Sequence, residues 1–296
     1  MPSVPRWPCV TPRNIYSVPL AHGSVLVLGP RPLVMGILNV TPDSFAEAVP
    51  LTARAAVDLA LQMESDGADL IDVGGESTRP GAEPVSAGEE ADRVLPVIEA
   101  LRGRLRIPIS IDTYKSSVAD AALGSGAAMV NDVSGLLYDP EMAGVVASRG
   151  AAVVLMHTRG RPKAMYEEAQ YKDVIAEVTL ELRDRMSRAM AAGIPIERIL
   201  VDPGLGFAKQ PMHSYGVLAR LPDVAAALDR PVVLGPSRKS FLREAAGGRA
   251  APDRDWATAA AVTAAVLSGV HIVRVHAVAE MVQVVRAAEA IRRAQG

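Results

Sequence analysis

The sequence is almost free of cysteine and has no long apolar run. Cys9 is the only cysteine among 296 residues, so the chain can form no internal disulfide and no thiolate metal cluster. Prolines and arginines interrupt the first residues, which leaves no apolar core for a signal peptide. No apolar run approaches the roughly 18 residues that a membrane-spanning helix needs. We therefore expect a cytoplasmic protein with no membrane partner.

A strong excess of charge of either sign is also absent. Lys and Arg number 31 against 33 Asp and Glu, for a formal net charge of −2. This balance excludes a general electrostatic attraction to nucleic acid, so any basic site must be local. Hydrophobic residues make up 49% of the chain and charged residues 22%, which is enough for a sizeable core and unlike a disordered chain.

The chain does contain eight short apolar runs separated by helical stretches. Val and Ile dominate the runs, with little polar alternation, which is typical of parallel strands buried on both faces. Eight strand-helix units in series favour a closed (β/α)₈ TIM barrel over the alternative, a doubly wound open sheet. The runs cover residues 33–38, 70–73, 107–111, 127–130, 153–156, 199–201, 232–234 and 272–275.

The segment before the barrel predicts a small separate element. Residues 17–20 and 24–28 flank a short turn, which indicates an N-terminal β-hairpin that closes the bottom of the barrel. We therefore divide the chain into an extension with the hairpin, residues 1–30, and a barrel domain, residues 31–296. Helices are expected at residues 53–65 and 173–192, and Ser86 with Glu89 indicates a capping box at another helix start.

Polar residues follow the apolar runs, at the point where each predicted strand ends. In a (β/α)₈ barrel these strand ends meet on the face that carries the active site, whereas the opposite face serves stability. The pattern therefore predicts one site at one end of the barrel. The residues in question are Asn39, Glu76, Asp112, Asn131, Asp202, Lys239, Arg274 and His276.

The motifs around these residues resemble those of one enzyme family. The segments are MGILNVTPDSF (35–45), DVGGESTRPG (72–81), VDPGLGF (201–207), GPSRKS (235–240) and RVH (274–276). Together they look like dihydropteroate synthase, in the family's order, from about Arg31 to the C-terminal helix. Agreement across several strand ends is more specific than any single glycine motif.

The resemblance implies a transferase of folate biosynthesis. Such an enzyme joins 6-hydroxymethyl-7,8-dihydropterin diphosphate to p-aminobenzoate and releases diphosphate and 7,8-dihydropteroate. It implies Mg²⁺ as the cofactor, a homodimer, an SN1-like route and a target of sulfonamides. The nucleophile is the substrate's own amine, so no Ser-His-Asp or Cys-His group is needed. Transition-state charge would be stabilised by Asp112, Asp202, Lys239, Arg274 and His276.

A pterin ring suits the carboxylates expected inside the barrel. A buried carboxylate is costly without donors, so Asp112 and Asp202 with Asn131 call for a ligand rich in N–H groups. A structural ion pair is the alternative for each acid. The resemblance adds Lys239 at the ring carbonyl and nitrogen, with Met156 and Phe207 as apolar contacts.

A second group of residues suits a diphosphate. Arg79 and Arg274 could bind phosphate bidentately, and His276 could add a charge-assisted hydrogen bond, although a buried structural histidine is the alternative. Asn39 could give its carbonyl oxygen to a Mg²⁺ that also takes phosphate oxygens and waters. His157 and His271 are better read as structural histidines.

The resemblance assigns p-aminobenzoate to two loops and a helix start. Thr78, Arg79 and Pro80 would help to bind it, and Ser240 would contact its carboxylate, although a plain capping role for Ser240 is an alternative. Two departures from the family occur. The loop after Phe45 reads AEAVP in place of the usual Ser-Asp-Gly-Gly, and Ala277 replaces a frequent aspartate.

Two other functions share part of this pattern. A cobalamin-dependent methyltransferase has a similar pterin-binding barrel, but it would not need the anion-binding set, and the chain has no corrinoid-binding domain. The altered first loop also leaves open a non-catalytic pterin-binding protein. We expect the synthase, with two small-molecule substrates and no nucleic-acid partner.

Overall fold

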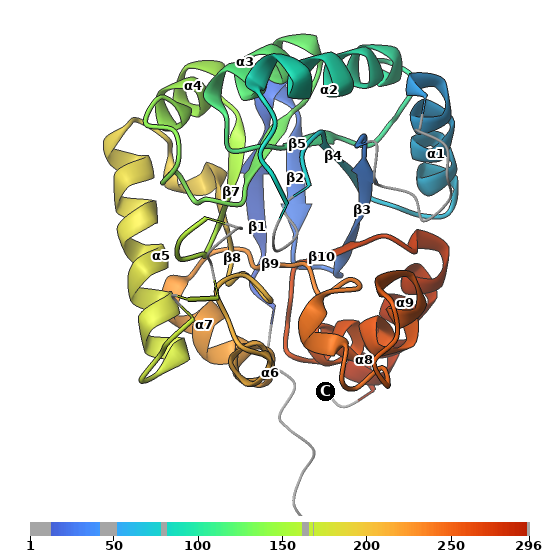
Figure 1. The fold of residues 1–296 in the computed structure, drawn as a ribbon, viewed down its shortest axis with the longest axis vertical. Helices are drawn as coiled ribbons and strands as arrows, with labels where there is room; N and C mark the ends of the chain where they lie inside the picture. The colour runs from blue at the N-terminus through green and yellow to red at the C-terminus, as the bar shows by residue number, and fades with distance from the viewer. Residues whose placement is uncertain (1–12, 42–51, 78–81, 162–165, 168, 295–296) are drawn as a thin grey trace, which may run out of the picture.

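The computed structural model describes residues 13–41, 52–77, 82–161, 166–167 and 169–294. Within these ranges eight parallel strands form a barrel that is surrounded by helices (Figure 1). The strands are β3 (Leu33–Asn39), β4 (Leu70–Gly74), β5 (Ile109–Asp112), β6 (Met129–Asp132), β7 (Ala152–Met156), β8 (Ile199–Asp202), β9 (Val233–Leu234) and β10 (Ile272–Val275).

The neighbouring strands pair in the order β8-β7-β6-β5-β4-β3-β10-β9. The two outer strands of this order also meet, because the Val201 N–H donates to the Pro231 carbonyl at 3.0 Å and Val201 forms a parallel bridge with Val232. This contact closes the sheet. The (β/α)₈ TIM barrel is therefore confirmed, and the open doubly wound sheet is wrong.

The helices form the outer ring and follow the expected signals. Ser86 accepts from the Glu89 N–H at the start of the second helix, and Asp173 caps the longest one. The helices are α1 (Ala53–Ser65), α2 (Ala87–Leu101), α3 (Ser116–Ser125), α4 (Met142–Arg149), α5 (Val174–Ala191), α6 (Pro211–Ala219), α7 (Leu221–Leu228), α8 (Asp255–Leu267) and α9 (Val278–Arg293), with 3₁₀ turns at Ala21–Gly23, Ile196–Arg198, Ser240–Leu242 and Ala251–Arg254.

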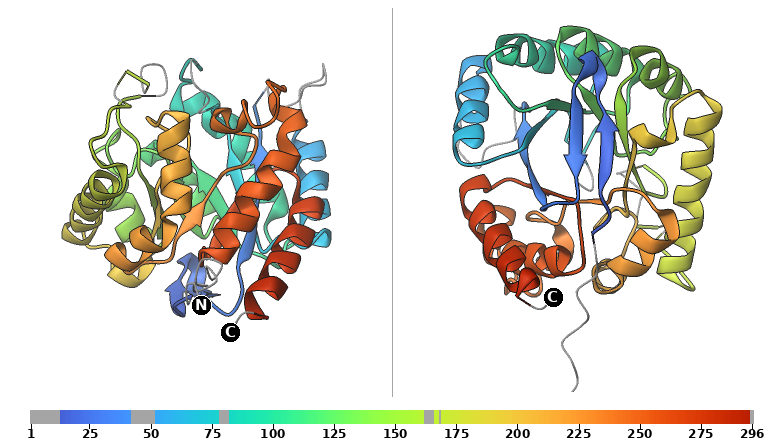
Figure 2. Two further views of the ribbon diagram at one scale, coloured as in Figure 1. Left: turned by 90° about the horizontal axis from the view of Figure 1, so that it is seen from below. Right: turned by 180° about the vertical axis from the view of Figure 1, so that it is seen from behind.

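The expected hairpin lies across the end of the barrel at which its strands begin, which we call the lower end (Figure 2, right view). Its strands β1 (Tyr16–Pro19) and β2 (Val25–Leu28) are antiparallel. Val18, Leu26 and Leu28 pack in one buried cluster with residues from the barrel interior. The turn is fixed as well, since the Ala21 N–H donates to the Ala128 carbonyl at 3.0 Å. The hairpin therefore seals this end of the barrel.

Strand boundaries agree with the expected runs to within two residues. β6 starts later than the run at 127–130 and continues through two polar residues, Asn131 and Asp132. Backbone pairing carries a strand past the point where its apolar residues stop, because pairing does not depend on side-chain polarity. This extension places polar side chains on strands rather than on loops at the upper end.

Candidate active site

The interior of the barrel is polar at its upper end, where the strands finish. This follows from the way side chains alternate along each strand. Leu70, Met129, Leu200 and Ile272 belong to the apolar cluster in the lower interior. Side chains on a strand alternate between its two faces, so the next residue on the same face also points into the barrel, one layer higher. Those next residues are Asp72, Asn131, Asp202 and Arg274.

Arg274 links carboxylates from two adjacent strands. Its Nε donates to Asp72 Oδ2 at 2.5 Å, and its Nη2 donates to Asp112 Oδ2 at 2.5 Å. Asn131 Nδ2 donates to the same Asp72 oxygen at 2.9 Å. The structure therefore gathers Asp112, Asn131 and Arg274 around Asp72, a residue that the sequence motifs did not single out.

Burial shifts the pKa values of the charged groups in this interior. Burial raises the pKa of Asp112 above its ordinary range, against the opposing charge of Arg274. Burial likewise raises the pKa of Asp202, against the charge of Lys239. The pKa of Lys239 falls to about 8 through burial, against the opposing effect of Asp202. Such mutually perturbed groups in one place are typical of functional sites.

The backbone after β8 holds Asp202 and Lys239 in place. The Gly204 N–H donates to Asp202 Oδ1 at 2.7 Å, and Lys239 Nζ donates to the Leu205 carbonyl at 2.7 Å. Lys239 Nζ also lies 4.5 Å from the centre of the Phe207 ring. One short loop therefore orients a carboxylate, an ammonium and an aromatic ring.

The two expected apolar residues lie together. Met156 and Phe207 form a buried cluster with Val133 and Ala208, and two tyrosines pack against it. An apolar cluster beside polar groups is typical of small-molecule sites. The tyrosines, Tyr114 and Tyr166, carried no sequence signal because neither follows an apolar run.

Asn39 ends β3 and Asp112 ends β5, and Gly74 of β4 lies between them. Gly74 is the register partner of both residues. A Cβ atom at Gly74 would lie 3.7 Å from Asn39 Oδ1 and 3.6 Å from Asp112 Oδ2. The glycine therefore leaves both oxygens close to the same point. The described residues contain no group of three or more His, Cys, Asp or Glu side chains that could hold a metal.

His276 follows β10 and is oriented by Ser237. Ser237 Oγ accepts from the His276 backbone N–H at 3.1 Å and lies 2.9 Å from His276 Nδ1. The two contacts fix the orientation of the His276 ring, and because a hydroxyl can both donate and accept, Ser237 suits either tautomer of that ring. Ser237 belongs to the GPSRKS segment, but its contact with His276 could not be predicted from the sequence.

Ser240 lies at the edge of the site, with its Oγ 2.8 Å from the Tyr166 hydroxyl. It begins a single 3₁₀ turn whose cap position is Lys239, and no side chain caps that turn. The capping role considered for Ser240, at the start of a helix, is therefore wrong. Thr78, Arg79, Pro80 and the divergent loop after Thr41 lie outside the described residues.

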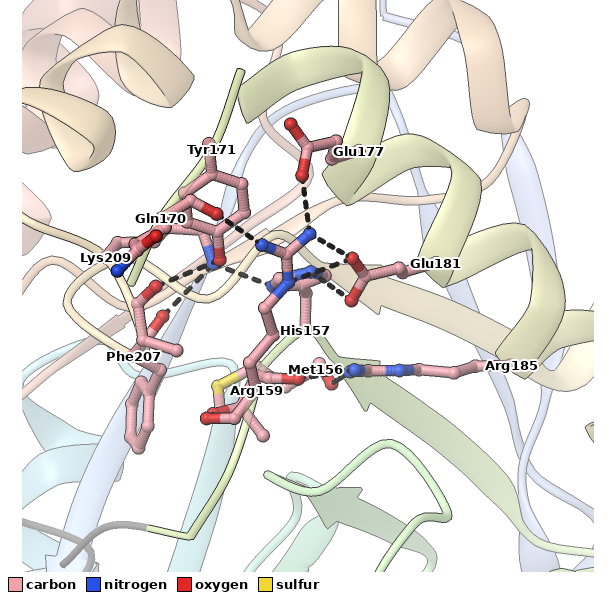
Figure 3. A network of polar contacts seen from close by, with 12 residues as sticks. Met156, His157, Arg159, Gln170, Tyr171, Glu177, Glu181, Arg185, Phe207 and Lys209 are labelled. Carbon is pink, nitrogen blue, oxygen red and sulfur yellow. Dashed lines mark hydrogen bonds and ion pairs between the residues drawn. The ribbon is translucent and has the colours of Figure 1, made fainter. Parts of the chain in front are cut away.

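A second buried network centres on His157 and Lys209 and contacts the loop that carries Phe207 (Figure 3). Lys209, 1% exposed, donates from Nζ to His157 Nδ1 at 2.8 Å and to the Phe207 carbonyl at 3.2 Å. Burial and the Lys209 charge lower the pKa of His157 to about 3. The neutral ring therefore donates from Nε2 to Glu181 at 3.1 Å. These bonds tie the Phe207 loop to β7 and to α5.

Both histidines interpreted as structural are confirmed as such. His157 is the centre of the network just described. His271 Nδ1 accepts from the Val232 N–H at 3.1 Å, and its Nε2 lies 3.1 Å from the Asn14 carbonyl. Both rings are buried with both nitrogens bonded.

Comparisons with known proteins agree with this geometry. Residues 35–276 match the model of a family described as pterin binding enzyme. Dihydropteroate synthase from Synechocystis sp. is 43% identical over 282 residues, which cover 95% of this chain and 97% of that protein. The folic acid synthesis protein fol1 of Schizosaccharomyces pombe is 45% identical over 265 residues, and the chain spans only 36% of its length.

A solved structure shares the fold over nearly the whole chain. The Xanthomonas albilineans dihydropteroate synthase with 4-aminobenzoic acid superposes with a TM-score of 0.85 at 41% sequence identity. The alignment covers 93% of this chain and 98% of that one. Fold and sequence therefore agree over the same residues.

Proposed function

The chain belongs to the pterin binding enzyme family, among its dihydropteroate synthases, and from that premise we propose how its own residues act. The enzyme is a transferase of folate synthesis. It joins 6-hydroxymethyl-7,8-dihydropterin diphosphate to p-aminobenzoate. Coverage of 97% of a dihydropteroate synthase favours this activity over a methyltransferase-type barrel.

The pterin ring would bind in the upper interior of the barrel. The observation that carries this proposal is the group formed by the buried Asp72 and Asn131 with the partly buried Asp112 and Arg274, which are joined by hydrogen bonds where the strands end. Asp112 and Asp202 offer acceptors for ring N–H and amine groups, and Lys239 offers a donor for the ring carbonyl. Met156 and Phe207 would contact the flat faces of the ring.

The diphosphate would lie toward His276 and Asn39. A protonated His276 would add a charge-assisted hydrogen bond to a phosphate oxygen. Both described bonds of Arg274 go to carboxylates. We therefore assign Arg274 mainly to the ring and its charge, with diphosphate contact through its remaining nitrogen. Arg79 would complete the anion site from its loop.

Mg²⁺ fits this arrangement as a cofactor shared with the substrate. Asn39 Oδ1 would hold it together with phosphate oxygens and waters, which is how Mg²⁺ is usually bound. The bound ion would neutralise charge on the departing diphosphate. The negative charges of Asp112 and Asp202 would favour a cationic pterin, which supports an SN1-like route.

The p-aminobenzoate would approach from the open end of the barrel. Its carboxylate would lie near Ser240, and Thr78, Arg79 and Pro80 would close over it. The Ser240 hydroxyl already has a polar partner in Tyr166, so the carboxylate would have to share that contact. In an SN1-like route the C–O bond to diphosphate would break first, and the arylamine would then attack the methylene carbon of the cationic pterin. The released proton passes to water.

The test is product formation from the two defined substrates. Purified protein with Mg²⁺, pterin diphosphate and p-aminobenzoate should form 7,8-dihydropteroate and diphosphate in equal amounts. Omitting p-aminobenzoate is the control for simple hydrolysis. Removing Mg²⁺ with EDTA should abolish turnover and its return should restore it. Binding of the pterin without product formation would identify a non-catalytic pterin-binding protein.

Assembly and location are separate proposals. A homodimer is supported by Trp256 of α8, which is 91% exposed beside an apolar hollow of about 680 Å³. Sedimentation of the purified protein and of Trp256→Glu should give a dimer and a monomer. No helix in the described ranges is long and apolar enough to cross a membrane. We propose a cytoplasmic location, which cell fractionation would test.

A further inference from the structure

Asp72 is a buried carboxylate to which the reaction outlined above assigns no contact with either substrate. It is 0% exposed, in the middle of a strand whose neighbouring residues are apolar. Its Oδ2 accepts two hydrogen bonds, while its Oδ1 has no hydrogen-bond partner among the described residues. A buried ion pair is often no more stable than a well-packed apolar group of the same volume. Stability alone is therefore a weak reason for this carboxylate.

Asp72 fixes which end of the Asn131 amide faces a ligand. An ionised carboxylate only accepts hydrogen bonds, so only the NH₂ group of Asn131 can face Asp72 Oδ2. That bond is 2.9 Å long. The carbonyl oxygen of Asn131 is then directed away from Asp72. Asn131 is thereby held as an acceptor, although the amide could otherwise rotate and present donors.

Asp72 also fixes the plane of Arg274. The guanidinium uses Nε for Asp72 and Nη2 for Asp112, so one edge of a rigid planar group spans two adjacent strands. Two bonds to separate anchors determine the orientation of the whole plane. The bond to Asp112 alone would leave Arg274 free to turn about it. The orientation of Arg274 beside Asp112 therefore depends on Asp72.

We propose that Asp72 is a positioning residue that sets the hydrogen-bonding pattern of the ring site through Asn131 and Arg274. It touches no substrate itself. Its two bonds select a ligand that presents a donor to Asn131, as the amine and amide edge of a pterin does. This inference rests on the proposed function, because the ligand whose recognition it explains is the pterin.

The test is calorimetric titration of 6-hydroxymethylpterin into wild type, Asp72→Asn and Glu289→Gln. Asp72→Asn keeps the shape but can face Asn131 with either end of its amide, so the Kd should rise at least tenfold. Glu289→Gln is the matched control. It removes another buried carboxylate that binds an arginine, Arg13 at 2.8 Å, far from the site. It should lower the melting temperature and leave the Kd within twofold.

Stoichiometry separates positioning from folding. A purely structural role would reduce the number of binding sites per chain or the melting temperature, while the folded fraction kept the wild-type Kd. That result would overturn the proposal. In an Asn131→Ala background, Asp72→Asn should weaken binding clearly less than it does alone, because part of its effect passes through Asn131. Full additivity would contradict the proposal.

Two further outcomes are informative. If Asp72→Asn does not fold, Asp72→Ser is the second variant, since it is smaller and keeps one acceptor. Failure of both to fold would make Asp72 a folding residue and overturn the proposal. If the wild-type protein itself does not bind the pterin, the proposed function fails. Equal binding by wild type and Asp72→Asn refutes only the inference about Asp72.

Discussion

Replacing Asp202 by Asn removes a charge with little change in shape. Asp202 is 5% exposed at the end of β8, and its Oδ1 accepts the Gly204 N–H at 2.7 Å. An asparagine oxygen can accept the same bond, so the loop should keep its conformation. Burial already raises the pKa of Asp202, so the charge is costly to the fold. The melting temperature of Asp202→Asn should therefore stay close to that of wild type.

The substitution Asp202→Asn should instead reduce activity toward the pterin substrate. A hydrogen bond to a buried charged group contributes about 1.5–3 kcal/mol, which corresponds to roughly a 10- to 150-fold loss of kcat/KM for the pterin substrate. The pH profile should change as well. Lys239 has a pKa of about 8 and is cationic below it, and Asp202 raises that pKa while burial and Arg274 lower it. Without Asp202, activity should begin to fall at a lower pH than in wild type.

Steady-state kinetics across pH 6–10 would measure both effects. Asp184→Asn is the control, because it removes an exposed carboxylate on α5 that pairs with Arg188 in the same helix. It should change kcat/KM by less than twofold. An Asp202→Asn enzyme with wild-type kcat/KM would remove Asp202 from the mechanism. A reduced activity with an unshifted alkaline limb would show that Lys239 does not act as a cation.

The same reasoning gives two further predictions. His276→Ala should weaken the binding of the pterin diphosphate far more than that of free hydroxymethylpterin. Arg274→Ala should weaken the binding of both ligands, since Arg274 is bonded to the ring-site carboxylates. Calorimetry with the two ligands distinguishes the variants, and the same pattern for both would contradict the assignment. Gly204→Ala should destabilise the fold by more than about 2 kcal/mol, because Gly204 has a φ of +71° and its Cβ would lie 1.9 Å from the His157 carbonyl oxygen. Gly144→Ala, in a helix with open space around it, should instead stabilise the fold by about 0.5–1 kcal/mol. Chemical denaturation would measure the unfolding free energies of both glycine variants. Equal effects would refute the steric argument.

The barrel and most of its site could be predicted because both follow from local patterns. Strand ends reveal themselves by a polar residue after an apolar run, and Asp112 and Asn131 were expected from that signal. The hairpin was predictable from two short strands around a turn. These features depend on neighbouring residues in the sequence, which is why composition and spacing were sufficient.

The residues that the sequence could not reveal act through contacts distant along the chain. Asp72 stands inside an apolar run, and its partner Arg274 is 202 positions away. Ser237 gains its role from His276, and Lys209 from His157, through folding alone. The expected role of Arg274 at the diphosphate also could not include its carboxylate partners, because no spacing rule connects β4 with β10.

The sealed lower end of the barrel leaves the candidate active site open at the other end only. The hairpin blocks one end, so substrates and products must pass through the same mouth. The ring site lies deep, with Asn131 and Asp202 each 5% exposed, whereas Ser240 lies at the exposed edge. A molecule held near Ser240 would obstruct the way to the deeper position. If the substrates bind as proposed, we expect the pterin to enter before p-aminobenzoate. A molecule that occupied the mouth first would then inhibit the enzyme by blocking access rather than by competing for the ring site.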